Sequence, residues 1–229
     1  MRRAGLAFAF ALWSVTAHGQ VSGSASVASD YRFRGISLTG NRPAIQATVD
    51  YDAPSGLYAG AFASNVRLDD RHSDTAQLLG FAGYSVRLGE ATDVDVGASA
   101  SAFPGERIYD YAEVHAGIAW SGIAARASYA PHYFGQHGAT WYFEASGSHP
   151  LRESVNAFVR AGFLRQESAG DYDSRTPRNI VDAGAGVAFD LSGLTATVAW
   201  TGVSTLQYGY PVAGAKHRNA VVVSVMRRF

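Results

Sequence analysis

The chain has 229 residues, which is enough for one sizeable domain, and its formal net charge is zero. The apolar fraction is 47%, but only 17% of the residues are charged, which is below the quarter that is usual in soluble domains. Because there is no cysteine and no basic patch, the composition excludes disulfides, thiolate metal ligands and cysteine nucleophiles, and it indicates no nucleic-acid partner.

The N-terminal segment has the pattern of a secretory signal peptide. Arg2 and Arg3 precede an apolar stretch from Ala4 to Val15, and Ala17-His18-Gly19 stands before Gln20. About a dozen apolar residues are too few for a transmembrane helix, which needs about 20. We therefore predict a signal peptide over residues 1–19 and a mature domain over residues 20–229. Removing residues 1–19 removes two arginines and no acid, which leaves 17 basic and 19 acidic residues, a net charge of −2.

From residue 20 onward, apolar and polar residues alternate with period two, in segments of about ten to thirteen residues separated by turn residues. In the first segment the odd positions from Val21 to Phe33 are mostly apolar, and the even positions from Ser22 to Arg34 are mostly polar. About twelve strands are expected, although ten are possible because segments 76–88 and 93–103 alternate weakly. The expected strands are 21–34, 45–52, 57–68, 76–88, 93–103, 111–120, 123–133, 140–148, 155–166, 179–189, 194–203 and 220–229.

The connections between these segments alternate in length. Short connections with turn residues are expected at 53–56, 89–92, 121–122, 149–153 and 190–193. Longer polar connections are expected at 34–43, 69–75, 104–110, 134–139, 167–178 and 204–218. A mature chain without a further long apolar run enters a membrane only as a closed sheet. The sequence therefore predicts an all-β fold, a transmembrane antiparallel up-and-down β-barrel, with both chain ends on the periplasmic side.

Aromatic residues fall near the ends of the predicted strands, as in the aromatic belts of membrane barrels. We expect Tyr51, Trp120, Phe189 and Phe229 at the periplasmic edge, and Tyr31, Phe33, Trp141 and Phe163 at the outer edge. The terminal Phe229 follows alternating valines and resembles the signal that the barrel-assembly machinery recognises. Arg227 departs from that signal, because an apolar residue is more usual there, but a long side chain near an interface can snorkel to water.

Several motifs resemble the TorF family of porin-like proteins, a conserved hypothetical family of outer-membrane barrels. The similarity is dense over residues 25–66 and sparse after residue 130. It implies a single-domain outer-membrane barrel and no particular substrate. The motifs are Ser29-Asp30-Tyr31-Arg32-Phe33-Arg34-Gly35-Ile36-Ser37, Pro43-Ala44-Ile45-Gln46, Asp50-Tyr51, Gly56-Leu57-Tyr58-Ala59-Gly60, Ala63-Ser64-Asn65-Val66, Phe103-Pro104-Gly105 and Tyr111-Ala112-Glu113-Val114.

Polar side chains on the inward faces of the predicted strands are the candidate pore-lining residues. The most charge-dense row is Asp30, Arg32 and Arg34 on one face of the first strand. This row either biases permeation by its charge or forms an ion-pair network that braces the wall, with Asp50 as a partner across the first hairpin. The remaining candidates are Gln46, Glu113, His115, Arg126 and Glu144.

These features predict a channel in the outer membrane of a Gram-negative bacterium for passive diffusion of small hydrophilic solutes or ions. Twelve strands enclose a narrower lumen than the 16–18 strands of wide porins, and loop 204–218 is expected to narrow it further. A closed structural or surface-interaction barrel is the main alternative. A barrel enzyme acting on envelope lipid is a weaker one, because no Gly-x-Ser-x-Gly motif accompanies the Glu113–His115 pair. A soluble lipocalin-like barrel would turn the apolar face inward. Neither the histidines nor the Asp69–Asp74 segment has the spacing of a metal site, so no metal or cofactor is expected.

Overall fold

The computed structural model describes residues 19–68, 75–135, 138–167, 179–206 and 217–229. The predicted signal peptide and most of the predicted loops 69–75, 167–178 and 204–218 lie outside these residues. In the described ranges, no helix is long and apolar enough to cross a membrane.

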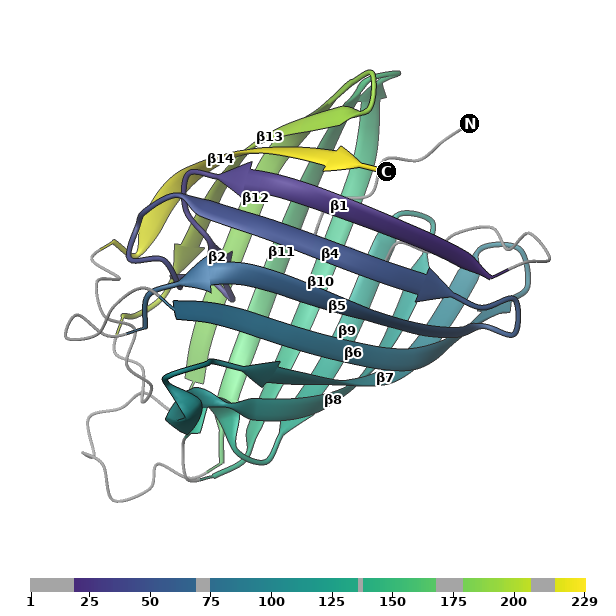
Figure 1. Cartoon of the computed structure of the whole chain (residues 1–229). Coiled ribbons are helices and arrows are strands. Elements are labelled where there is room, and N and C mark those ends of the chain that lie inside the picture. The colour runs from purple at the N-terminus through teal and green to yellow at the C-terminus, as the bar shows by residue number, and fades with distance from the viewer. Residues whose placement is uncertain (1–18, 69–74, 136–137, 168–178, 207–216) are drawn as a thin grey trace.

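The described residues form a closed barrel of twelve antiparallel strands (Figure 1). Each strand pairs with its neighbours in chain order, and β1 pairs with β14 to close the barrel. The barrel strands are β1 (Gln20–Ala28), β4 (Ala44–Asp52), β5 (Leu57–Val66), β6 (Thr75–Leu88), β7 (Thr92–Ala102), β8 (Tyr111–Trp120), β9 (Ile123–Ala130), β10 (Thr140–Arg152), β11 (Val155–Gln166), β12 (Asn179–Leu191), β13 (Leu194–Val203) and β14 (Asn219–Arg228). The prediction of twelve strands is confirmed, and the two weakly alternating segments form β6 and β7.

Short and long connections gather at opposite ends of the barrel, which we call the turn end and the loop end. At the turn end, Ser121-Gly122 and Ser192-Gly193 each have two consecutive positive φ angles, the conformation of a tight two-residue hairpin turn. Strand β10 extends to Arg152, beyond the predicted end at residue 148, with a register shift after Pro150. A proline lacks the N–H that continued pairing needs, so it is accommodated at an irregularity of this kind.

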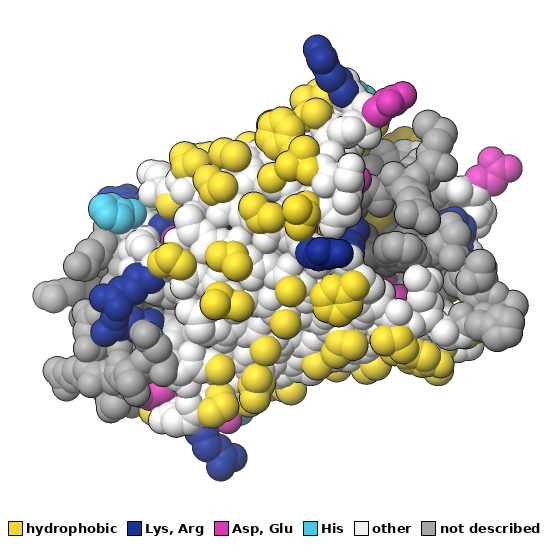
Figure 2. All heavy atoms as spheres, turned by 45° about the horizontal axis from the view of Figure 1, so that its top comes forward, with side chains coloured by type: hydrophobic (Ala, Val, Ile, Leu, Met, Phe, Trp, Pro, Cys, Tyr) yellow, Lys and Arg dark blue, Asp and Glu magenta, His cyan; other side chains and the backbone are white. Residues whose placement is uncertain are grey.

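The distribution of side chains is the inverse of that in a soluble protein. Large apolar residues point outward, for example Ile45, which is 71% exposed, and Val21, which is 69% exposed. Figure 2 shows hydrophobic side chains spread across the middle of the outer wall. The alternate positions point into the lumen and combine Ser, Thr, Gln and charged residues with glycines, alanines and some aromatic and aliphatic side chains. An apolar exterior around a polar interior is the arrangement of a barrel that spans a bilayer.

One expectation about the first strand is wrong. Strand β1 ends at Ala28, and residues 29–43, which we call the inserted segment, turn into the loop end of the lumen. The segment contains a small hairpin of β2 (Arg32–Phe33) and β3 (Ile36–Ser37), with positive φ at Arg34 and Gly35 in its turn. A hairpin arm has the same period of two as a continuing strand, so the alternation through residue 34 does not distinguish them.

The inserted segment contributes three apolar side chains to the buried cluster in the lumen. Tyr31, Ile36 and Leu38 of this segment are at most 4% exposed. They pack against side chains from two short 3₁₀ helices, η1 (Arg107–Tyr109) and η2 (Tyr133–Gly135), and from the surrounding strands. Tyr31 and Phe33 are therefore not members of an outer aromatic belt, which corrects that prediction. The apolar core lies inside the loop end of the barrel.

Candidate functional site: the barrel lumen

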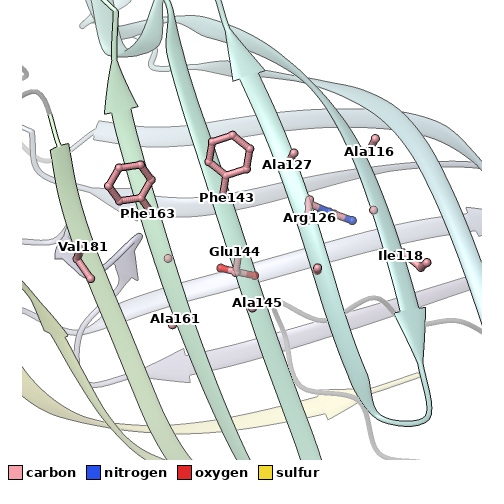
Figure 3. Close-up of a pocket in the computed structure, with 13 residues that line it drawn as sticks. Ala116, Ile118, Arg126, Ala127, Phe143, Glu144, Ala145, Ala161, Phe163 and Val181 are labelled. Atoms are coloured by element: carbon pink, nitrogen blue, oxygen red, sulfur yellow. The ribbon is translucent and has the colours of Figure 1, made fainter.

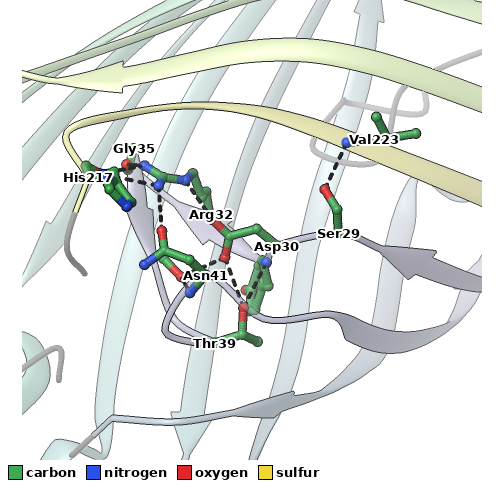
Figure 4. A network of polar contacts seen from close by, with 10 residues as sticks. Ser29, Asp30, Arg32, Gly35, Thr39, Asn41, His217 and Val223 are labelled. Carbon is green, nitrogen blue, oxygen red and sulfur yellow. Dashed lines mark hydrogen bonds and ion pairs between the residues drawn. The ribbon is translucent and has the colours of Figure 1, made fainter. Parts of the chain in front are cut away.

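Hydrogen bonds within the inserted segment hold it in a compact form around Asp30 (Figure 4). The Asp30 Oδ2 atom accepts a hydrogen bond from Arg32 Nε at 2.8 Å, and Oδ1 accepts from Ser37 Oγ and from Thr39 Oγ1 at 2.9 Å. Charge-assisted bonds of this kind are about twice as strong as neutral ones. The Arg32 guanidinium also donates to the Gly35 carbonyl, the Asn41 side chain and the His217 carbonyl. The two buried charges thus satisfy each other within the segment.

The inserted segment is attached to opposite sides of the barrel. Tyr31 Oη donates to Gln77 Oε1 on β6 at 3.0 Å, and burial raises the pKa of the phenol, so it stays protonated. The Leu38 carbonyl accepts from the backbone N–H of Arg67 at the end of β5. On the other side, Gly35 lies against Asp182 and Val203, where a Cβ atom would come within 3.0 Å of both side chains. The segment therefore crosses the lumen at the loop end.

Arg34, at the tip of the inserted segment, is enclosed by an acidic group and three aromatic rings. Its Nη2 atom lies 2.7 Å from Glu113 Oε2. Its guanidinium carbon lies 4.8 Å from the ring centre of Phe33, 4.9 Å from that of Tyr133 and 4.1 Å from that of Tyr142. Burial opposes the charge, but the Glu113 carboxylate and the neighbouring tyrosines Tyr133, Tyr111 and Tyr142 together outweigh it and hold the pKa of Arg34 above its ordinary value. We call Glu113, Tyr133 and Tyr142 the Arg34 cage.

A row of charged residues and glycines runs around half of the lumen at one register level. Cross-strand pairing places Asp95 of β7, Arg126 of β9, Glu144 of β10 and Asp182 of β12 in this row. Gly117 of β8 and Gly162 of β11 occupy the positions between them. Glycine leaves space over which a long neighbouring side chain can extend to the next strand. We call strands β7–β12 the charged wall.

At one end of the charged wall, three side chains meet at Asp95. Its Oδ2 atom lies 3.0 Å from both Tyr58 Oη and His115 Nε2, and 3.6 Å from Arg126 Nη2. Tyr58 comes from β5 and extends across β6 to reach this carboxylate. A Cβ atom on Gly97 would lie 2.7 Å from the Tyr58 hydroxyl, so the glycine makes this contact possible.

A second cluster lies on β10, β11 and β12. Arg160 Nη1 lies 2.7 Å from Asp182 Oδ1 and 3.3 Å from Glu144 Oε2, and Tyr142 Oη donates to Asp182 Oδ2 at 3.0 Å. A Cβ atom on Gly162 would collide with both the Tyr142 hydroxyl and the Asp182 carboxylate. The charged wall thus carries two ion-pair and hydrogen-bond clusters, one around Asp95 on β7–β9 and one around Arg160 and Asp182 on β10–β12.

Four of the remaining strands present mainly hydroxyl groups to the lumen. We call β13, β14, β1 and β4 the hydroxyl wall; its inward residues include Ser22, Ser24, Ser26, Thr48, Thr195, Thr197, Thr201 and Ser224. Gln46 lies between Ser26 and Ser64, at 3.4 and 3.3 Å. Asp50 and Asp52 lie toward its turn end, opposite Ser22 and Gln20 on β1. In the described residues neither carboxylate has an ion-pair partner within 4 Å, although Arg228 acts electrostatically on Asp50.

All nine candidate pore-lining residues lie inside the barrel, but not in one group. Glu113, His115, Arg126 and Glu144 face the lumen from the charged wall, and Gln46 and Asp50 from the hydroxyl wall. Asp30, Arg32 and Arg34 belong to the inserted segment. An ion-pair network is present, but the expectation that Asp50 pairs with this row is wrong, because Asp50 lies toward the other end of β4. Whether the nine residues line a conducting path stays a prediction.

The sequence reasoning missed four residues that hold these clusters: Tyr58, Asp95, Arg160 and Asp182. Each lies on the polar face of a predicted strand, and Asp95 lies in one of the weakly alternating segments. A signal was present in the inward-facing glycines, which mark positions where a neighbouring side chain extends across. In the described part of the chain, no group of three or more His, Asp or Glu side chains is placed to hold a metal ion.

The outside of the barrel carries a hollow of about 720 Å³. Figure 3 shows Phe143 and Phe163 at one side of it, with Ala145 and Ala161 beside them and Ile118 and Val181 at its margins. The alanines lie in one register row below the two phenylalanines, so short side chains next to long ones create the depression. Most of its lining side chains are apolar and point outward, although the inward-facing residues Arg126 and Glu144 also border it, so the hollow is part of the bilayer-facing surface.

Solved porins have the same fold. A NanC porin superposes with a TM-score of 0.60 at 8% identity, covering 90% of this chain and 98% of the porin. A KdgM porin superposes with a TM-score of 0.56 at 8% identity, covering 91% of this chain and 99% of the porin. No curated protein matches the sequence, and neither porin carries the TorF name, so that resemblance stays at the level of the motifs. A family model described as "Bacterial protein of unknown function (Gcw_chp)" matches residues 14–229, and the chain belongs to this family.

Proposed function

We propose that the protein is a porin-like channel in the outer membrane of a Gram-negative bacterium, and that the signal peptide 1–19 directs its export. Small hydrophilic solutes or ions diffuse through it passively. The inserted segment forms the narrowest part of the path, at the loop end. The closed barrel and its apolar exterior support the membrane location.

The observation that carries this proposal is a charged lumen that is still accessible to solvent. The Arg126 side chain is 35% exposed, Glu144 24% and Arg160 20%, although all three point inward. A dry barrel interior would make exposed charges of this kind costly, because an ion in a low-dielectric medium loses its hydration. Water therefore fills the lumen up to the charged wall, and a hydrophilic solute finds hydrogen-bonding partners there.

A closed structural or surface-interaction barrel is the second candidate, and one specific observation favours it. The inserted segment is fastened to both sides of the barrel and carries a buried apolar cluster, Tyr31, Ile36 and Leu38. If this segment never leaves the lumen, solutes do not pass.

Conductance measurements distinguish the two candidates. We would refold the purified protein into planar bilayers and record single channels for the wild type and for Asp30→Ala, which loosens the inserted segment. The channel proposal predicts discrete steps in the wild type that become larger in the variant. The absence of steps in both proteins, each with intact barrel circular dichroism, would replace the channel by the closed barrel.

The KdgM neighbour has also been solved in complex with disordered oligogalacturonate. We do not extend that acidic solute to this chain, because the central lumen arginines of this chain are already paired with carboxylates. Arg34 pairs with Glu113, Arg126 with Asp95, and Arg160 with Glu144 and Asp182. The proposed solutes are accordingly defined by size and hydrophilicity only. Because the supporting neighbours are porins, the proposal assigns no catalytic activity.

We also propose that Phe229 presents the chain to the barrel-assembly machinery. Its backbone N–H donates to the Gly23 carbonyl at 3.0 Å, and its carbonyl accepts from the Gly23 N–H at 2.9 Å. The ring lies over Gly23 and is 78% exposed. Phe229 therefore lies at the seam between the first and last strands, where barrel closure is completed, and its ring is accessible to a binding partner.

A further inference from the structure

The Arg34 cage belongs to the barrel, whereas the cation inside it comes from the inserted segment. Glu113 projects from β8, Tyr142 from β10 and Tyr133 from η2. The Arg34 guanidinium lies over the Tyr142 ring at 4.1 Å and over the Tyr133 ring at 4.9 Å, and it donates to Glu113 at 2.7 Å. One carboxylate and two aromatic faces that converge on a single point form a binding site for an organic cation.

We infer that the Arg34 cage binds solutes that carry a guanidinium group, and that Arg34 occupies the cage as a built-in competitor while the inserted segment crosses the lumen. Solute binding would replace the Arg34 guanidinium by a chemically equivalent one. The inference deepens the proposed channel function by naming a solute class, and it rests on that function only for the passage of the solute.

The geometry favours guanidinium over other cations. A planar cation can stack on a tyrosine face and at the same time donate an in-plane hydrogen bond to a carboxylate. Arg34 here lies over the Tyr142 ring and donates to Glu113. An alkali ion or an ammonium group is more strongly hydrated and lacks the flat face that the Tyr142 ring contacts. The site is also nearly dry, with Glu113 14% and Arg34 7% exposed, so it selects cations that lose their hydration easily.

The backbone of Arg34 suggests that its occupation of the cage is reversible. Its φ angle is 49°, in the left-handed region that residues other than glycine rarely adopt, and the next residue, Gly35, has φ of 83°. A residue held in this region retains its conformation only while surrounding contacts compensate for the strain. When a solute guanidinium takes over the contacts of the Arg34 side chain, the strained turn is free to relax.

The other hydrogen bonds that hold the inserted segment do not involve Glu113, Tyr133 or Tyr142, the three residues of the Arg34 cage. Tyr31 bonds to Gln77, Leu38 bonds to Arg67, and Asp30 bonds to Arg32, Ser37 and Thr39. Replacing Arg34 therefore empties the cage without removing these hydrogen bonds. This separation allows a test by chemical rescue.

The test compares binding of guanidinium chloride to folded variants in detergent micelles, followed by isothermal titration calorimetry at constant ionic strength. Guanidinium is used at about 10 mM, far below the molar concentrations at which it unfolds proteins. Arg34→Ala should bind guanidinium saturably, and Arg34→Ala/Glu113→Gln should bind it about tenfold more weakly or not at all, because the charge-assisted hydrogen bond is lost. Potassium at the same concentration should give no saturable heat.

Arg126→Ala is the matched control, since it removes another lumen arginine without emptying an aromatic cage. Equal binding by Arg126→Ala and Arg34→Ala would overturn the inference, as would equal binding by Arg34→Ala with and without Glu113. Arg34→Gln, which keeps the length of the side chain without its charge, replaces Arg34→Ala if the alanine variant does not fold.

Single-channel recording separates this inference from the channel proposal. In the wild type, added guanidinium should raise the open probability, because it displaces Arg34 from the cage, whereas Arg34→Ala should show no such increase. Saturable binding in a protein that never conducts would leave the cage assignment intact and remove the channel. Conductance without saturable binding would leave the channel proposal intact and overturn the cage assignment.

Discussion

The barrel wall and the inserted segment are held by different kinds of interaction. The wall is a repeated backbone ladder in which each strand pairs with two neighbours, for example β6 with β7 from Leu78–Ala102 to Leu88–Thr92. The inserted segment has only one hairpin, formed by two strands of two residues each. Its position depends on side-chain contacts, above all those of Asp30 and Arg34. The wall is therefore tolerant of single substitutions, whereas one substitution can loosen the segment. The same chain can keep a rigid barrel while its loop end changes.

The largest effect is expected where the wall itself is weakest, at the seam between β1 and β14. Their register extends only from Ser24–Arg228 to Ala28–Ser224, and Phe229 adds two hydrogen bonds beyond it. Deleting Phe229 should remove most of the folded barrel from the outer membrane, since the two closing hydrogen bonds and the proposed recognition by the assembly machinery are both lost. Heat-modifiable migration of the membrane fraction on gels measures this. Val225→Ala, an outward residue on the same strand, is the control, and equal barrel levels in the two variants would contradict the role of Phe229.

Asp30→Ala should break the inserted segment and leave the wall intact. It leaves the Arg32 guanidinium buried without its carboxylate, a change that costs about 3–5 kcal/mol in the folded segment. Limited proteolysis should then cleave within residues 29–43, while barrel circular dichroism stays unchanged.

The control for this variant is Ser26→Ala on the wall. It removes only a hydrogen bond of 3.4 Å to Gln46, which is worth at most about 1 kcal/mol. If Asp30→Ala resists the protease as well as Ser26→Ala does, the segment is held by its apolar contacts and not by the Asp30 hydrogen bonds.

A smaller effect is expected for glycines of the wall: replacing an inward-facing glycine by alanine should lower the free energy of unfolding more than replacing an outward-facing one. In Gly162→Ala the new methyl group displaces Tyr142 and Asp182, and overpacking of this kind costs about 1–3 kcal/mol. In Gly80→Ala the methyl group points to open space and should change the free energy of unfolding by less than about 0.5 kcal/mol. Urea unfolding in detergent gives both values. Equal stability of the two variants would mean that the Tyr142 cluster adjusts without cost.

The same contrast explains what could be predicted from the sequence. The wall was predictable because period-two alternation and turn residues such as Ser121-Gly122 act locally, and each strand repeats the rule. The inserted segment was not predictable, because residues 30–34 alternate as a strand does. The residues that bind them inside the lumen, Gln77 and Glu113, lie far along the chain. Both cation-binding tyrosines of the Arg34 cage are contributed by regions beyond residue 130. Only the three-dimensional fold brings them to Arg34.

The smallest expected effect concerns charge selectivity, which the two walls should influence differently. In the charged wall each of the lumen arginines, Arg126 and Arg160, lies within 4 Å of a carboxylate, whereas Asp50 and Asp52 on the hydroxyl wall have no ion-pair partner within 4 Å in the described residues. We therefore expect a preference for cations, and Asp50→Asn/Asp52→Asn should move the reversal potential in a salt gradient toward zero. The double variant Arg87→Gln/Asp93→Asn removes a 2.8 Å ion pair at the same end and should leave the potential unchanged, because the net charge stays the same.

The salt dependence sharpens this last prediction. The Debye length is about 10 Å at 0.1 M salt and about 3 Å at 1 M, so the field of Asp50 and Asp52 reaches across a narrow lumen only at low salt. The difference between the wild type and Asp50→Asn/Asp52→Asn should accordingly be largest in dilute solutions and disappear near 1 M. A difference that persists at 1 M would mean that the two carboxylates contact the permeating ion directly. An unchanged reversal potential at low salt would assign selectivity to the charged wall or to the inserted segment, and the hydroxyl wall would then only provide hydrogen bonds to the solute.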